Sequence, residues 1–107
     1  MKWKVSYFNK KVTDGLKSWP VRMRAKYLRI VELMEEHGPH LGEPITKPIN
    51  NGLFEIRVKA KEGIGRAFFC YQIANEIVIL HSYIKKSQKA PKKEIEIAYK
   101  RMKEICK

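Results

Sequence analysis

Three strand-length segments joined by tight turns constrain this chain more than any other feature of its sequence. Segment 53–59 alternates apolar and polar residues, and segments 66–73 and 77–84 are rich in aromatic and β-branched residues. Turns are predicted at Gly63-Ile64-Gly65 and at Asn75-Glu76. Because such short turns join antiparallel neighbours, the sequence predicts an antiparallel meander in the second half of the chain.

The alternation also predicts which way the strand residues face. Phe54 and Ile56 share one face of the first segment, and Glu55 and Arg57 share the other. The third segment is almost continuously apolar, which is typical of a central strand covered on both faces.

Helical spacing dominates the regions outside the meander. A helix is predicted after Ser18-Trp19-Pro20 and should end at His37-Gly38-Pro39, and a last helix should start at Pro91. The sequence also predicts an N-terminal strand near residues 2–8, a short helical turn from Asp14 to Trp19 and a long loop from Gly38 to Gly52. We therefore predict one α+β domain over residues 1–107, ordered β-α-α-β-β-β-α, with a small antiparallel sheet and helices packed on one side.

The charge of the chain calls for an anionic partner. Its 23 Lys and Arg against 11 Asp and Glu give a net charge of +12. Such an excess fits nucleic acid, an anionic membrane surface or an acidic protein, with solubility as the alternative explanation.

Cysteine use and hydropathy indicate a cytoplasmic protein. Cys70 and Cys106 form neither a metal motif nor a disulfide framework, which fits a reducing compartment. The sequence shows no signal peptide and no apolar run near the roughly 20 residues of a membrane helix. No His, Cys, Asp or Glu set has metal-ligand spacing, so we predict no metal, no cofactor and no membrane partner.

The predicted turns bring cations together at one edge of the meander. Counting from the turns places Arg66 roughly opposite Ile84 or Lys85, with Arg57 one or two residues away on the neighbouring strand. The lysines that follow directly are Lys85, Lys86 and Lys89. Because like charges repel, this cluster is expected to bind an anion such as a nucleic-acid phosphate, unless the side chains spread onto a solvated rim.

Aromatic residues accompany these cations. Tyr83 precedes the lysines, and Phe68 or Tyr71 lies on the facing strand. An exposed ring beside cations is used to stack a single-stranded base, although the Phe residues fit the core better.

Three stretches of the sequence resemble the RelE/HigB toxins of bacterial type II toxin–antitoxin systems, in their phage-derived HigB-like branch. They are Gly52-Leu53-Phe54-Glu55-Ile56-Arg57, Arg66-Ala67-Phe68-Phe69-Cys70-Tyr71, and Ile79-Leu80-His81-Ser82-Tyr83-Ile84-Lys85-Lys86-Ser87-Gln88-Lys89-Ala90-Pro91. The resemblance implies an endonuclease that cleaves mRNA in the ribosomal A site and inhibits translation. It also implies a cognate antitoxin partner, often a HigA-like helix-turn-helix protein.

Cleaving RNA without a metal requires three tasks, which the candidate residues can share. Arg57 and Arg66 suit stabilisation of the charge on phosphate. Lys85 or Lys86 is a candidate acid or base, because neighbouring cations lower a lysine pKa. The remaining proton transfer is assigned to Tyr83 or to His81, which also fits a hydrogen-bonded core position. Three further lysines are predicted to contact RNA, with a solvated helix face as the alternative for the last two: Lys89, Lys92 and Lys93.

Two non-enzymatic alternatives stay open on the same fold. One is a gyrase-directed toxin of the ParE type, although that branch generally lacks a full basic set such as this chain retains. The other is a degenerate toxin or plain RNA-binding module, which would bind RNA with strong salt dependence and yield no cleaved product.

Overall fold

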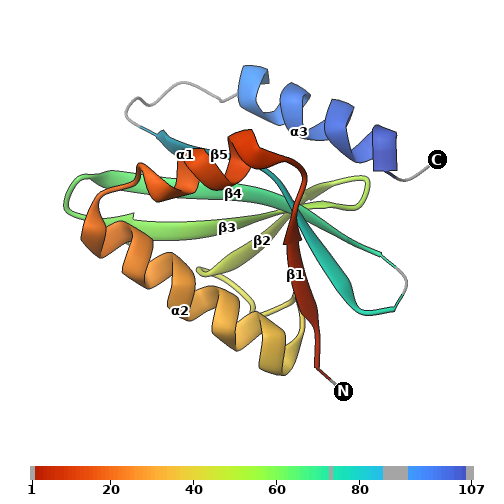
Figure 1. Cartoon of the computed structure of the whole chain (residues 1–107), viewed down its shortest axis with the longest axis horizontal. Helices are drawn as coiled ribbons and strands as arrows, with labels where there is room; N and C mark the ends of the chain where they lie inside the picture. Colours follow the sequence, from red (N-terminus) through yellow and green to blue (C-terminus); the bar gives the residue numbers. More distant parts are fainter. Residues whose placement is uncertain (1, 73, 86–91, 106–107) are drawn as a thin grey trace.

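A computed structural model of the chain describes residues 2–72, 74–85 and 92–105 of its 107 residues. Figure 1 shows a twisted sheet flanked by helices. The elements are β1 (Lys4–Tyr7), α1 (Lys10–Lys17), α2 (Val21–His37), β2 (Thr46–Asn50), β3 (Leu53–Ala60), β4 (Gly63–Gln72), β5 (Glu76–Lys85) and α3 (Lys92–Ile105). The predicted α+β class and the predicted sequence of strands and helices are confirmed, with one strand added.

The sheet has five strands in the order β1-β5-β4-β3-β2. Its central part is the predicted antiparallel meander of β3, β4 and β5. The N-terminal strand β1 pairs in parallel with β5, with Lys4 opposite Glu76 and Tyr7 opposite Ile79. The first strand and the last helix of the chain therefore both contact β5.

The added strand β2 lies inside the segment that the sequence predicts as a loop. It pairs with β3 at the edge of the sheet, and its register shifts between Pro48 and Asn50. Proline cannot donate a ladder hydrogen bond, so it is confined to edge strands and bulges. The prediction of a loop over the whole of Gly38 to Gly52 was therefore wrong, because a segment with the Pro and Gly content of a loop can still pair as a short edge strand.

Helices α1 and α2 cover one face of the sheet. The buried side chains of α2 recur at helical spacing as Met23, Tyr27, Val31 and Met34, and they pack with β-strand residues such as Ile56 and Phe69. Gly38 ends α2 with a φ of 96°, a left-handed conformation that favours glycine. Helix α1 begins earlier than the predicted turn, because the Asn9 side chain caps it by accepting from the Val12 N–H at 3.1 Å.

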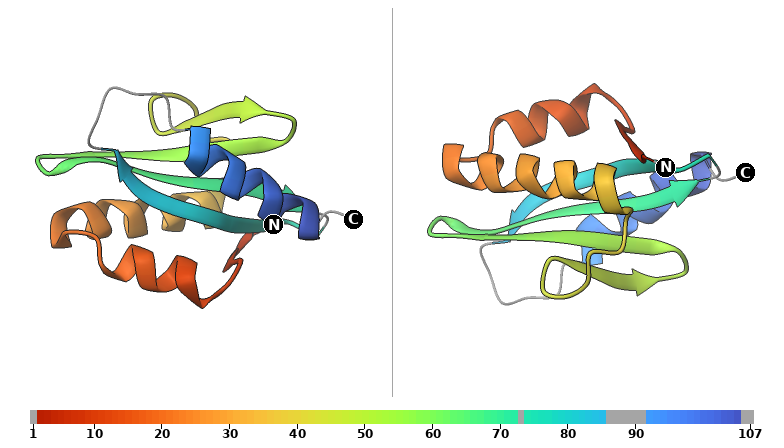
Figure 2. Two further views of the ribbon diagram at one scale, coloured as in Figure 1. Left: turned by 90° about the horizontal axis from the view of Figure 1, so that it is seen from above. Right: turned by 90° about the horizontal axis from the view of Figure 1, so that it is seen from below.

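Helix α3 packs on the opposite face, so the expectation that all helices lie on one side was wrong. Successive β4 residues point to opposite faces, and both are apolar, with Phe69 toward α2 and Phe68 toward α3. Figure 2 shows α1 and α2 lying together while α3 crosses β5. The predicted apolar face of the last helix does make this second core: Ile95, Ala98, Tyr99, Met102 and Ile105.

The α3 face is only partly apolar. Leu53, Phe68 and Leu80 are buried beneath the helix. Toward the β3–β4 turn the same face carries charged and hydroxyl-bearing side chains instead.

None of the helices in the described part of the chain combines the length and the apolar character needed to cross a membrane.

Candidate functional site

Three rows of residues cross β3, β4 and β5 on the α3 face. The inner row is Glu55, Phe68 and His81, the middle row is Arg57, Arg66 and Tyr83, and the outer row is Lys59, Ile64 and Lys85. Residues two apart on a strand share a face, so all three rows point the same way. The sheet therefore gathers the predicted arginines and Tyr83 into one line.

The strand register differs slightly from the prediction. Arg66 lies opposite Tyr83 rather than Ile84 or Lys85, and Arg57 lies directly opposite Arg66. The cause is the β4–β5 turn, which is centred earlier than Asn75-Glu76: Ala74 and Asn75 take positive φ values of 69° and 58°. A bulge next to Phe68 partly offsets this difference: the register at the turn alone would place Arg66 opposite Ser82, and the bulge moves its partner to Tyr83.

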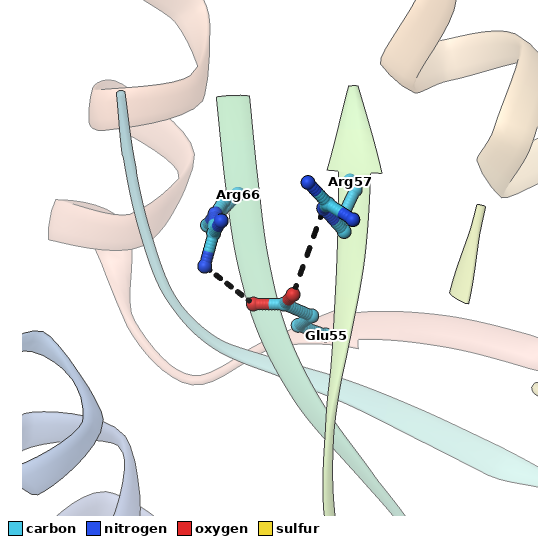
Figure 3. A network of polar contacts seen from close by, with 3 residues as sticks. All are labelled: Glu55, Arg57 and Arg66. Atoms are coloured by element: carbon cyan, nitrogen blue, oxygen red, sulfur yellow. Dashed lines mark hydrogen bonds and ion pairs between the residues drawn. The ribbon is translucent and has the colours of Figure 1, made fainter. Parts of the chain in front are cut away.

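Glu55 is the member of this site that the sequence analysis missed. Its side chain is only 3% exposed, and it forms ion pairs at 3.8 Å with Arg57 Nε and at 3.5 Å with an Arg66 terminal nitrogen. Figure 3 shows the carboxylate between the two arginines. The available signal was its position two residues before Arg57, on the same predicted face of the strand.

Three polar atoms in the middle row are buried without a hydrogen-bond partner among the described residues. They are Arg57 Nε, Arg66 Nε and Tyr83 Oη. Buried polar groups are normally hydrogen-bonded, so such atoms in one row call for an explanation. They offer hydrogen-bond donors to a ligand that carries acceptor oxygens.

Tyr83 is held as a neutral phenol. Burial raises the pKa of its hydroxyl, and the negative charges of Glu55 and Glu94 raise it further, whereas the positive charge of Arg66 acts in the opposite direction. Its ring stacks on Phe68 with 5.8 Å between centroids and lies nearly parallel to the His81 ring. The hydroxyl can therefore donate a proton or a hydrogen bond at neutral pH.

The other aromatic candidates do not present rings at this site. Phe68 is fully buried in the α3 core, as the alternative interpretation expected. Tyr71 is 42% exposed, but it packs in an edge arrangement against Trp3 and His40 instead of joining the middle row.

His81 makes a contact of its own. Its Nε2 lies 2.7 Å from Glu94 Oε1 of α3. The contact connects the inner row to the first turn of the last helix, so Nε2 has a partner before any substrate binds.

The predicted lysines are placed at the rim. Lys85 is partly exposed and ends the outer row, whereas Lys92 and Lys93 are exposed in the first turn of α3. Lys86 and Lys89 lie outside the described residues. A hollow of about 230 Å³ adjoins the middle and outer rows and is lined by Pro44, Ile45, Arg57, Lys59 and Ile64.

No set of three His, Cys, Asp or Glu side chains within residues 2–72, 74–85 and 92–105 is grouped to hold a metal ion. The chemistry that these side chains offer is anion binding by guanidinium groups beside a neutral phenol.

Comparison with known proteins places this geometry in context. No curated protein matches the sequence. A chain of the RelBE2 toxin–antitoxin complex from Mycobacterium tuberculosis superimposes with a TM-score of 0.59 at 16% identity, covering 79% of this chain and 100% of that one. A chain of the archaeal RelE–RelB complex from Pyrococcus horikoshii OT3 gives a TM-score of 0.57 at 22% identity, covering 78% and 96%.

These structural matches confirm the fold that the sequence resemblance implied. The family described as phage derived protein Gp49-like matches residues 14–103, which is most of the chain. The chain therefore belongs to the phage-derived Gp49-like family and has the fold of the RelE structures.

Proposed function

We propose that this protein is the toxin of a type II toxin–antitoxin system and cleaves mRNA on the ribosome. The observation that carries the proposal is the middle row, where two opposed arginines and a neutral phenol bury unpartnered polar atoms side by side. A phosphodiester supplies the acceptor oxygens that such donors require.

The proposed mechanism assigns roles by chemistry. Arg57 and Arg66 bind the scissile phosphate and stabilise the charge that develops on it, because guanidinium stays charged and offers paired donors. Tyr83 donates its proton to the leaving 5′ oxygen, a role that its raised pKa permits at neutral pH. Lys85 or Lys86 takes the proton of the attacking 2′ hydroxyl, and the lysines Lys89, Lys92 and Lys93 hold flanking phosphates.

We further propose a cytoplasmic protein with an antitoxin partner. Two solved structures that share this fold are the RelBE2 toxin–antitoxin complex and the archaeal RelE–RelB complex. A HigA-like helix-turn-helix antitoxin that covered the basic rows would hide the arginines from RNA and prevent cleavage. The net charge of +12 favours an acidic contact surface on that partner.

The decisive experiment measures mRNA cleavage on programmed ribosomes. The wild-type chain should yield a cut in the A site, and Arg57→Ala or Arg66→Ala should slow it by roughly 10²- to 10³-fold, as expected for loss of one charge-stabilising group. Arg22→Ala is the matched control, because it removes an exposed cation from α2 on the other face of the sheet.

Two outcomes would contradict the proposal. One is a folded wild-type chain that leaves ribosome-bound mRNA intact but inhibits gyrase supercoiling, which would favour the ParE-like alternative. The other is RNA binding without any cleaved product, which would favour a plain binding module.

A further inference from the structure

The buried carboxylate of Glu55 is costly and therefore informative. Glu55 as a whole residue is 2% exposed. It and Thr46 are the two polar residues that are buried in the described part of the chain. Removing a carboxylate from water costs several kcal/mol unless close ion pairs and hydrogen bonds offset the loss.

The ion pairs of Glu55 are not arranged for the greatest stability. Charge-assisted hydrogen bonds between nitrogen and oxygen typically measure about 2.7–2.9 Å. Glu55 lies 3.5 Å from Arg66 and 3.8 Å from Arg57, and the Nε atoms of both arginines are without hydrogen-bond partners among the described residues. The carboxylate holds the arginines near it without using all of their donors.

The two arginines need such a restraint. They form a direct cross-strand pair, where side chains of like charge repel. The Arg57 side chain is 30% exposed, so water is within its reach if nothing holds it over the sheet. Without a carboxylate between them, the guanidinium groups would turn apart.

We infer that Glu55 is a positioning residue, whose carboxylate fixes Arg57 and Arg66 for the transition state while weakening the binding of RNA phosphate in the ground state. The inference rests on the proposed function. The charge balance supports it: two arginines and one glutamate sum to +1, whereas the arginines alone would offer +2 to an incoming phosphodiester. Interactions that favour the ground state raise affinity without raising the rate of the chemical step.

The inference predicts opposite changes in affinity and rate. Glu55→Gln should bind RNA at least about tenfold more tightly, since a charge within about 4–6 Å changes such equilibria by one or more powers of ten. The RNA affinity of this variant should also depend more steeply on salt. The slope of log K against log salt should steepen by about 0.7, which corresponds to one additional phosphate contact on a single strand. Single-turnover cleavage should fall at least about tenfold, because the arginines lose their fixed orientation.

The experiment compares affinity with rate. Affinity is measured by fluorescence anisotropy with a 2′-O-methyl RNA oligonucleotide, which cannot be cleaved at the 2′ position, over a range of salt concentrations. Rate is measured on ribosome-bound mRNA under single-turnover conditions. Glu62→Gln is the matched control, because Glu62 is an exposed carboxylate at the β3–β4 turn and its removal changes net charge equally.

Failure of the inference is distinguishable from failure of the proposed function. A folded wild-type chain that neither binds the oligonucleotide nor cleaves mRNA contradicts the function. An active wild-type chain whose Glu55→Gln variant matches Glu62→Gln in affinity and rate overturns the role of Glu55. If Glu55→Gln does not fold, Glu55→Asp decides: it keeps the charge, so affinity should stay at the wild-type value while the shortened side chain slows cleavage, and an unchanged rate overturns the inference.

Discussion

His81 Nε2 and Glu94 Oε1 lie 2.7 Å apart, and this contact fastens β5 to α3 beside the candidate site. Both side chains are mostly buried, at 17% and 27% exposed. Since Nε2 already has a partner, we expect His81 to position the site more than to transfer a proton. His81→Ala should lower the free energy of unfolding by roughly 1–3 kcal/mol, the cost of leaving a buried polar group without its partner.

Urea unfolding and ribosome-bound cleavage check this prediction together. Cleavage by His81→Ala should fall much less than cleavage by Arg66→Ala. A variant of unchanged stability that no longer cleaves would instead assign His81 the acid or base role that the sequence analysis kept open.

Arg57 and Arg66 should differ in their importance for stability. Arg66 is 13% exposed and 3.5 Å from Glu55, whereas Arg57 is 30% exposed and 3.8 Å away. Breaking a buried ion pair leaves an uncompensated charge, and exposure to water reduces that cost. We expect Arg66→Met to lower the free energy of unfolding by about 3 kcal/mol and Arg57→Met by about 1 kcal/mol.

Chemical denaturation of the two variants measures this difference. Adding Glu55→Gln to Arg66→Met should recover part of the loss, because the unpaired buried carboxylate is then gone. Equal losses for both arginines, or no recovery in the double variant, would mean that the ion pairs with Glu55 do not control stability.

The strands of the meander were predictable because alternation and turn residues act locally. Phe54 and Ile56 do share one face, and Glu55 and Arg57 share the other. What alternation could not predict is whether a polar face meets water. Glu55 is buried on the face where α3 packs, and Arg57 and Arg66 pair with it. The helix comes from a distant part of the chain, and the contact with Arg66 depends on the register between β3 and β4, so neither follows from alternation within one strand.

The missed strand and the shifted register have a similar cause. The segment Thr46–Asn50 contains Pro48, and its local composition therefore predicts a loop. The segment nevertheless pairs at the sheet edge, where a missing N–H is tolerated. The position of Arg66 opposite Tyr83 depends on a bulge next to Phe68 that leaves no evident mark in the sequence. The candidate residues could be predicted, but their contacts could not.

Gly65 should not tolerate a methyl group. A Cβ at this position would lie 2.7 Å from Met23 Sδ and 2.8 Å from the Trp19 ring, both buried in the core between α2 and the sheet. Overpacking of this kind costs about 1–3 kcal/mol, so Gly65→Ala should lower the thermal midpoint by several degrees.

Gly15 provides the matched substitution. Its Cβ would meet only Ser82 Oγ at 3.5 Å, an ordinary contact. Because alanine is favoured over glycine within a helix by about 0.8–1 kcal/mol, Gly15→Ala should raise the midpoint instead. Calorimetry on both variants checks the pair, and a stabilised Gly65→Ala would show that α2 can move away from β4 at little cost.

Tyr27 should make the protein sensitive to alkali. Burial raises its pKa far above the ordinary value of 10.0, and the neighbouring Tyr7 hydroxyl, 3.0 Å away, raises it further. The folded state therefore keeps a proton that the unfolded chain releases above about pH 10. The stability due to the buried phenol is complete below that pH, and above it falls by about 1.4 kcal/mol per pH unit until the folded-state pKa is reached.

Tyr27→Phe tests whether Tyr27 causes this loss of stability at high pH. At pH 7 the variant should be less stable by roughly 1 kcal/mol, because the hydrogen bond to Tyr7 is lost. Between pH 10 and 11 its free energy of unfolding should fall by about 1 kcal/mol less than that of the wild type, because the unfolded-state tyrosine is only partly ionised at pH 10. Urea unfolding across this range measures both slopes, and parallel slopes would contradict a protonated, buried Tyr27.

Tyr83→Phe should separate function from stability most cleanly. The Tyr83 hydroxyl is buried without a hydrogen-bond partner among the described residues, while its ring stacks on Phe68. Phenylalanine keeps the stacked ring and removes a polar atom whose burial is uncompensated, so the free energy of unfolding should stay constant or rise. Cleavage should nevertheless fall by about 10²-fold or more if the phenol protonates the leaving oxygen.

The pH dependence of cleavage gives a second test of the same residue. Because burial raises the pKa of the Tyr83 phenol above the ordinary value of 10.0, any loss of wild-type cleavage caused by ionisation of this group should begin at a higher pH than an ordinary tyrosine would give. A Tyr83→Phe variant that unfolds more easily and cleaves at the wild-type rate would make the hydroxyl structural. In that case the proton for the 5′ oxygen would have to come from a lysine of the rim.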